Sequence, residues 1–222
     1  MTFQRARRPE QMAVRRSAIM TSAREMLTEK NLADISLREL SHRVGLAKSN
    51  VLRYFDSREA IFLEVFDEEF QAWLADLDRR LGKPRARKAG YVTEVRLATT
   101  MAASLVEAEL LCELLASMAV VLERNISGEF ARDFKARTMA NVAAVGQLVA
   151  RQLPWLPSEF TEFFADGALT LTAGMYPFSV PTEPVRAVMA EMGFPEPRER
   201  FSDGLRTGLL TWLIGAAAQT EA

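Results

Sequence analysis

Apolar side chains recur at helical spacing along nearly the whole chain. Between residues 15 and 30 they form one stripe, in which Ile19, Ala23 and Met26 lie on the same helix face. No run of alternating β-branched residues is present, and no Asn-Gly or Asp-Gly pair joins two such runs. The pattern therefore predicts an all-α fold.

Capping residues, glycines and prolines divide this pattern into separate helices. A long helix is expected to open at Asp56-Ser57-Arg58-Glu59 and to stop at Gly82-Lys83-Pro84. Ser127, Ser158 and Ser202 are expected to cap later helices. The later helices are expected at about 91–107, 109–124, 128–152, 158–176, 183–192 and 202–219.

Composition excludes several classes of site. The chain of 222 residues has a single cysteine, Cys112, which is expected to be buried and unreactive, and a single histidine, His42. An internal disulfide, a cysteine-based zinc site and a histidine cluster are therefore excluded, and we expect neither a cofactor nor a catalytic centre. The longest charge-free run, Gly167–Thr182, is too short to span a bilayer, and no apolar segment follows the basic N-terminus. A cytoplasmic location without a membrane partner is expected.

The charge is distributed unevenly. The net charge is −1, yet residues 1–58 hold 12 Lys or Arg against 6 Asp or Glu, so the remainder carries the acidic excess. A basic head on an acidic body suggests that the head meets a polyanion.

Two short helices are predicted close to the N-terminus. Ser36-Leu37-Arg38-Glu39 is a capping box that opens the first, and Gly45 provides the turn that ends it. The second is expected at about 48–54, and no acidic residue occurs from Ala47 to Phe55. This pattern is typical of a helix-turn-helix, although helical hairpins without DNA-binding function share it.

The same residues resemble a known family. The segment from Val44-Gly45-Leu46 through Tyr54-Phe55, followed by Ser57-Arg58-Glu59-Ala60, is similar to the helix-turn-helix of TetR-type transcriptional regulators. The resemblance implies a three-helix DNA-binding head and a larger helical body for ligand binding and dimerisation. The expected domains are residues 1–56, with the N-terminal arm and helix-turn-helix, and residues 57–222, with the connecting helix and the body.

The resemblance also implies DNA contacts. Arg38 is placed to read a guanine edge, Asn50 is able to pair with adenine, and Arg58 matches a family lysine that holds a phosphate. The alternative for each polar residue is a solvated helix face. The predicted DNA-binding residues are Ser36, Arg38, Lys48, Ser49, Asn50, Leu52, Arg53, Tyr54 and Arg58.

The N-terminal arm carries several arginines, among them Arg5, Arg7, Arg8, Arg15 and Arg16. It is interpreted either as a flexible arm that adds phosphate or minor-groove contacts or as a disordered tail. The sequence favours neither interpretation over the other.

One helix-turn-helix reads few base pairs, so a homodimer on a palindromic operator is expected. The resemblance implies that the last two long helices of each subunit form the seam, although an intramolecular core is the alternative. The predicted interface residues are Gly167, Leu171, Gly174, Leu205, Leu209, Trp212, Leu213 and Ala216.

The other body helices are rich in apolar and soft side chains, and family analogy suggests a cavity for a small apolar effector among them. The alternative is plain core. The predicted ligand-binding residues are Met101, Leu105, Leu115, Met118, Leu122, Phe134, Met139, Phe164 and Met175.

The sequence thus predicts a double-stranded-DNA-binding regulator, a repressor relieved by a small ligand. Two other functions remain open: a DNA-bound architectural or division-control adaptor, and a small helical enzyme, which lacks any recognisable catalytic motif.

Overall fold

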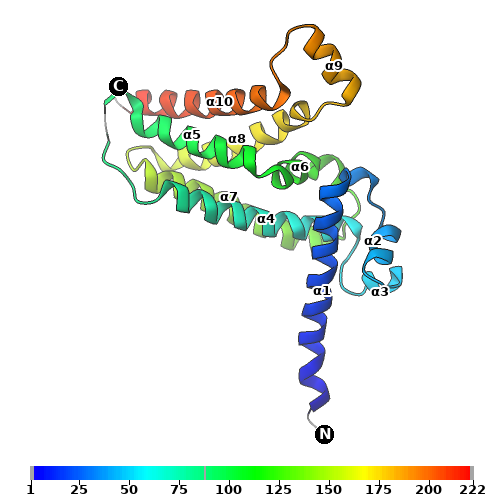
Figure 1. Ribbon diagram of the computed structural model, residues 1–222. Helices are drawn as coiled ribbons and strands as arrows, with labels where there is room; N and C mark the ends of the chain where they lie inside the picture. The colour runs from blue at the N-terminus through cyan, green and yellow to red at the C-terminus, as the bar shows by residue number, and fades with distance from the viewer. Residues whose placement is uncertain (1–2, 88, 221–222) are drawn as a thin grey trace. The chain divides into compact units, whose positions relative to one another are not determined.

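The computed structural model describes residues 3–87 and 89–220, and within these ranges every regular element is helical (Figure 1). The described chain forms two compact units. The first runs up to Glu68 and includes Ser117–Ala136, and the second comprises Glu69–Ala116 and the residues from Arg137 onward. The expected boundary at residues 56 and 57 thus falls inside the first unit.

The first unit contains the helices of the predicted head. Its elements are α1 (Phe3–Glu29), a 3-10 turn (Leu32–Asp34), α2 (Leu37–Arg43), α3 (Lys48–Val51), the first part of α4 (Arg58–Leu81), a π-helical turn (Met118–Leu122) and the first part of α7 (Gly128–Gln152). Within this unit α2 packs against both α1 and α3. Its core is apolar, with Ile19, Leu40 and Val51 fully buried.

Short polar side chains fix the starts of two helices in this unit. The Ser57 hydroxyl accepts a hydrogen bond from the Ala60 amide at 3.0 Å, as the expected cap of α4. The Ser127 hydroxyl accepts one from the Phe130 amide at 3.2 Å at the start of α7. Asp56 accepts a bond from the Ser127 amide at 2.6 Å, which ties the two helix starts together.

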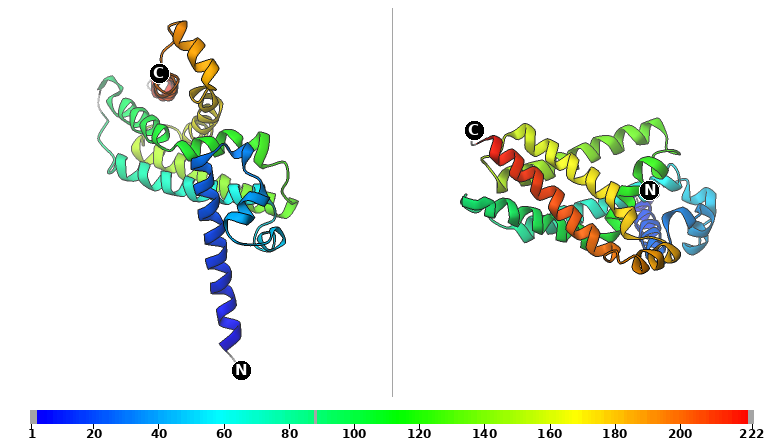
Figure 2. Two further views of the ribbon diagram at one scale, coloured as in Figure 1. Left: turned by 45° about the vertical axis from the view of Figure 1, so that its right-hand side comes forward. Right: turned by 90° about the horizontal axis from the view of Figure 1, so that it is seen from above.

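The second unit is the helical body. Its elements are the remainder of α4 and α7, α5 (Val92–Glu107), α6 (Glu109–Ser117), α8 (Ser158–Met175), a 3-10 turn (Tyr176–Ser179), α9 (Glu183–Glu191) and α10 (Pro197–Gln219). Helix α10 packs against α5 and α8, as the view from above shows (Figure 2). Leu205, Leu209 and Leu213 of α10 are fully buried, because they recur at every fourth position on its inner face.

Glycines let α8 and α10 approach closely. A Cβ atom on Gly167 of α8 would lie 3.0 Å from the Trp212 ring of α10, and one on Gly208 of α10 would lie 2.7 Å from a methyl of Leu171. Each of these helices thus offers a small residue where the other offers a large one.

The helix ends differ from expectation at several places. Helix α1 begins at Phe3 instead of near residue 15, so the described part of the arm is helical. Helix α10 begins at Pro197, which suits the first turn because proline has no amide hydrogen to leave unsatisfied. Ser202 therefore lies inside that helix, and Pro157 rather than Ser158 precedes α8. Within residues 3–87 and 89–220, no helix is long and apolar enough to cross a membrane.

Candidate nucleic-acid interface

The first helix of the predicted pair begins with the expected capping box. The Ser36 hydroxyl accepts a hydrogen bond from the Glu39 amide at 3.2 Å, and the Glu39 carboxylate accepts one from the Ser36 amide at 2.8 Å. Lys30 donates to the same carboxylate at 2.6 Å. The Lys30 ammonium, followed by the Ser36 amide and hydroxyl, lowers the pKa of Glu39 to about 2. The start of α2 is therefore fixed to the end of α1.

The turn between α2 and α3 is made by backbone geometry. Gly45 has a φ of +66°, a conformation that side-chain-bearing residues rarely adopt. After it, the Leu46 amide donates to the Ser41 carbonyl at 2.9 Å. The chain is thereby redirected into α3 within three residues.

The recognition segment, defined as residues 48–54, starts with a shorter helix than expected. Helix α3 covers only Lys48–Val51, and hydrogen-bonded turns continue it through Tyr54. Ala47 precedes it without a side-chain cap. Val51 is fully buried and Leu52 is 43% exposed, so one face of the segment meets the core and an adjacent face meets the solvent.

Charged side chains join the recognition segment to the neighbouring helices. Arg16 of α1 donates to the Tyr54 carbonyl and to Glu64, and its guanidinium lies 4.3 Å from the centre of the Phe55 ring. Arg43 of α2 donates to Glu29 of α1 at 2.6 Å. These bonds join α1, α2, α4 and the recognition segment into one framework.

Four cations around this framework have no such partner. Among the described residues, the structure gives no ion pair and no hydrogen bond to the cationic side chains of Arg15, Arg38, Lys48 or Arg53. All four are exposed. An uncompensated cationic surface of this kind suits a polyanion.

Most of the predicted DNA-binding residues lie on this surface. Tyr54 is half-buried, and seven others are exposed: Ser36, Arg38, Lys48, Ser49, Asn50, Leu52 and Arg53. The Ser36 hydroxyl is engaged in the capping box. DNA contact by these residues stays a prediction that their exposure favours.

Arg58 has a different environment. Its side chain is only 16% exposed and donates to the carbonyls of Ile35 and Leu32 and, at 2.9 Å, to Glu59. The guanidinium is thus engaged in hydrogen bonds that hold the 3-10 turn to α4. The predicted phosphate contact is not favoured by this placement.

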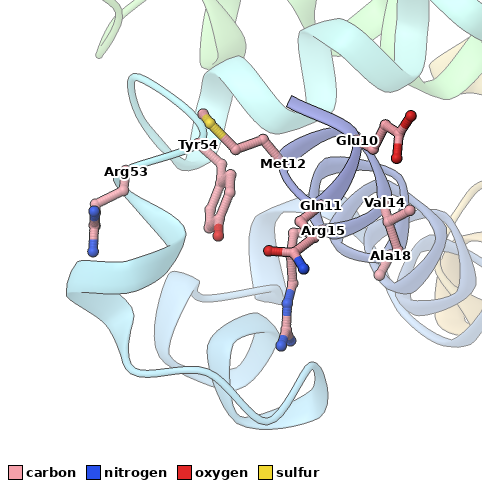
Figure 3. Close-up of a pocket in the computed structure, with 8 residues that line it drawn as sticks. All are labelled: Glu10, Gln11, Met12, Val14, Arg15, Ala18, Arg53 and Tyr54. Carbon is pink, nitrogen blue, oxygen red and sulfur yellow. The ribbon is translucent and has the colours of Figure 1, made fainter. Parts of the chain in front are cut away.

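The sequence left open whether the basic arm, which includes Arg15, contacts DNA. In the structure, residues of α1 between Glu10 and Ala18 line a groove together with Arg53 and Tyr54 (Figure 3). The row of arginines was the sequence signal for this region, and the side chains of Arg5, Arg7 and Arg8 lie outside the described ones.

The residues predicted to bind a ligand are dispersed. Met118, Leu122 and Phe134 belong to the first unit, whereas the other six belong to the second. Most are buried, Leu115 and Met175 are half-buried, and Met139 is 71% exposed. Met175 lines a cavity of about 170 Å³ with Phe178, Arg200 and neighbouring residues.

The predicted interface residues also separate into two groups. Leu205, Leu209, Leu213 and Ala216 are buried within a single chain, which favours the intramolecular alternative for these four. Gly167, Leu171 and Trp212 are half-buried between α8 and α10, and Gly174 is exposed.

Cys112 is fully buried, and burial raises the pKa of its thiol to about 12. The thiol is therefore protonated and unreactive at neutral pH, as the sequence predicted.

Comparison with known proteins gives this geometry its context. A family profile described as the C-terminal domain of tetracyclin repressor-like proteins matches residues 67–220, and one for bacterial regulatory proteins of the tetR family matches residues 19–65. The chain belongs to the TetR family. Members of this family are DNA-binding transcriptional regulators, and the second profile covers α2, α3 and the C-terminal part of α1.

Individual relatives in the TetR family are distant. The HTH-type transcriptional regulator RutR of Escherichia coli K12 is 27% identical over 71 residues, which are 32% of this chain. The chain spans about a third, 34%, of the length of that relative. The fatty acid degradation regulator FadR from Bacillus halodurans has a TM-score of 0.54 at 12% identity, covering 88% of this chain and 94% of its own. This second likeness shows the fold alone.

Proposed function

We propose that this TetR-family protein is a transcriptional repressor that binds an operator in double-stranded DNA through its recognition segment. One observation carries the proposal: the outer face of residues 48–54 is exposed and free of acidic residues, on a helix-turn-helix whose inward arginines are already paired. The short α3 is narrow enough to enter a major groove, which is about 12 Å wide.

Individual residues have chemically distinct roles in this proposal. Asn50 pairs with an adenine, and Arg38 at the start of α2 pairs with a guanine, because their planar groups offer two matched hydrogen bonds. Lys48 contacts a phosphate, and the exposed Leu52 contacts a thymine methyl group.

The protein acts as a homodimer in this proposal, because two recognition segments are needed to read a palindromic site. The support is an outward stripe on the two C-terminal helices. Phe163 of α8 is 64% exposed, and Thr207, Thr211 and Gly215 of α10 are exposed at helical spacing. This stripe replaces the buried leucines of α10 as the proposed seam.

A small apolar effector that prefers one spacing of the two recognition segments would relieve repression. An effector with equal affinity for both spacings would shift nothing. The support is limited to the soft apolar lining that Met175, Phe178 and Phe201 give to the cavity in the second unit.

The test is selection of duplex DNA from a random library by the full-length protein, followed by binding measurements on the selected sequence. We expect a palindromic sequence bound by a dimer in sedimentation equilibrium. Asn50→Ala should cost about 1–3 kcal/mol at one base position of each half-site.

The control is Asn125→Ala, which changes the same residue type at an exposed position in the loop before α7. Failure to bind any duplex at low ionic strength contradicts the proposal. Selection of many unrelated genomic sites in place of a palindrome would favour the architectural adaptor instead.

A further inference from the structure

The groove beside the recognition segment has two walls within the first unit. Its volume is about 1170 Å³. One wall is the middle of α1, between Glu10 and Ala18, and the other is the end of the recognition segment (Figure 3). The lining residues are Glu10, Gln11, Met12, Val14, Arg15, Ala18, Arg53 and Tyr54.

The polar groups of the groove face one way. In Figure 3 the Arg15 and Arg53 guanidiniums and the Tyr54 hydroxyl point toward the same side, whereas the Glu10 carboxylate turns away from them. The groove therefore presents cations from two walls and no facing carboxylate among its lining residues. A chain of negative charges fits it better than a single small anion, because the cations lie on separate walls.

The walls are held in place by a neighbouring residue. Arg16 follows Arg15 on α1, and its bonds to the Tyr54 carbonyl and to Glu64 tie α1 to the recognition segment. Consecutive helix residues lie about 100° apart around the axis, so Arg16 turns inward while Arg15 turns toward the groove. The groove is thus preformed rather than assembled by a ligand.

The ion pairs of the arginines on and near α1 support this difference between Arg16, which turns inward, and Arg15, which faces the groove. Arg16, Arg24 and Arg43 all have carboxylate partners. Arg15 and Arg53 have none among the described residues, although the first unit contains several exposed carboxylates. Their charges are available for an external anion.

We infer that the groove holds a sugar-phosphate strand of the operator DNA, at the edge of the bases read by the recognition segment. Arg15 and Arg53 bind phosphates from opposite walls, and the Gln11 amide and Tyr54 hydroxyl donate hydrogen bonds to phosphate oxygens. Met12, 50% exposed, contacts deoxyribose. The inference rests on the proposed function and adds residues 10–18 of α1 to the DNA-binding surface.

The test is the salt dependence of binding to the selected duplex, measured for the full-length protein. Arg15→Gln removes one cation that neutralises a phosphate in each protomer. We expect the slope of log affinity against log salt to become shallower by about 0.9 for each phosphate that is no longer neutralised, with affinity lowered equally for all sequences. The matched control is Arg24→Gln on the same helix, whose charge is paired with Glu68 and whose removal should leave the slope unchanged.

The outcomes separate the two proposals. A slope for Arg15→Gln equal to that of wild type, with specific binding retained, overturns the groove assignment and leaves the recognition segment in place. Absence of duplex binding by the wild-type protein overturns both. Thermal melts followed by circular dichroism exclude unfolding as the cause of a shallower slope.

A second measurement locates the strand directly. Cys112 is fully buried, so a cysteine introduced by Gln11→Cys can be labelled alone with a DNA-cleaving metal chelate. We expect cleavage of the backbone just outside each half-site. Glu191→Cys, on the exposed helix α9, is the control position, and cleavage no greater from Gln11→Cys than from this control overturns the inference.

Discussion

Both units of the molecule combine an apolar core with charged hydrogen bonds, but they differ in what joins the helices that carry the proposed interfaces. In the first, short helices are joined by charge-assisted hydrogen bonds, as in the bonds from Arg16, Arg43 and Arg58 to carboxylates and backbone carbonyls. In the second, α8 and α10 meet through apolar packing, with Gly167 against Trp212 and the leucines of α10 buried, and charged bonds join other helices, as from Arg80 to Glu107. The short helices α2 and α3 each bury only one or two side chains, so directed polar bonds add to the apolar core in fixing their positions.

This difference has a functional consequence. A scaffold of paired arginines holds the recognition segment rigidly and leaves the outer cations uncompensated. Apolar packing between helices, by contrast, depends mainly on volume and spacing, which many sequences satisfy. The packing of α8 on α10 can therefore accept substitutions that keep volume and spacing, whereas the scaffold of the recognition segment requires specific hydrogen-bonding groups.

The largest expected effect comes from Arg58. Arg58→Lys keeps the charge but loses the planar fork that reaches the carbonyls of Leu32 and Ile35. We expect the free energy of unfolding in urea to fall by about 1.5–3 kcal/mol, as for hydrogen bonds to a charged group. The salt dependence of DNA binding should not change.

The control is Arg24→Lys, because the pair of Arg24 with Glu68 is more exposed and should contribute less than about 1 kcal/mol. The variant Arg58→Gln, which removes the charge, tests the alternative role of Arg58 as a phosphate contact. If that variant kept its stability and made the salt slope of DNA binding shallower, Arg58 would be the phosphate contact that the family resemblance implied.

The second effect concerns the packing of α8 on α10. A methyl group added by Gly167→Ala would press on the Trp212 ring at 3.0 Å, whereas one added by Gly128→Ala, at the start of α7, would meet nothing within 4 Å. Alanine favours a helix by up to about 1 kcal/mol over glycine, so Gly128→Ala should not be destabilising. We expect Gly167→Ala to be less stable than Gly128→Ala by about 1 kcal/mol or more, measured by thermal unfolding. Equal melting temperatures would show that α8 and α10 are not in close contact.

Local signals explain what the sequence predicted well. The capping box at Ser36 and the glycine turn at Gly45 depend on residues within a few positions of each other, so the pattern alone specified them. The helical bounds of α7 were predicted correctly because Ser127 caps its start.

Contacts between residues far apart in the chain explain what the sequence did not predict. The partners of Arg58 lie 23 and 26 residues away in the sequence, and helical spacing gives no indication of them. Likewise, the apolar stripe of α10 was visible, but whether Leu209 faced α5 or a second subunit depended on tertiary packing. The groove beside α1 required the position of Tyr54 relative to Arg15, which only the fold determines.

The smallest expected effect is a pH dependence of the free energy of unfolding. Lys30 and the Ser36 amide and hydroxyl lower the pKa of Glu39 from 4.5 to about 2, so folding favours the charged carboxylate. The stabilisation is therefore complete above about pH 4.5 and disappears as the pH falls toward 2. Ser36→Ala removes the cap, so this part of the pH dependence should weaken between pH 4.5 and 2, as measured by urea unfolding at each pH. An unchanged dependence in the variant would show that the Ser36 hydroxyl does not stabilise the charged Glu39 carboxylate, since the backbone amide of residue 36 is kept.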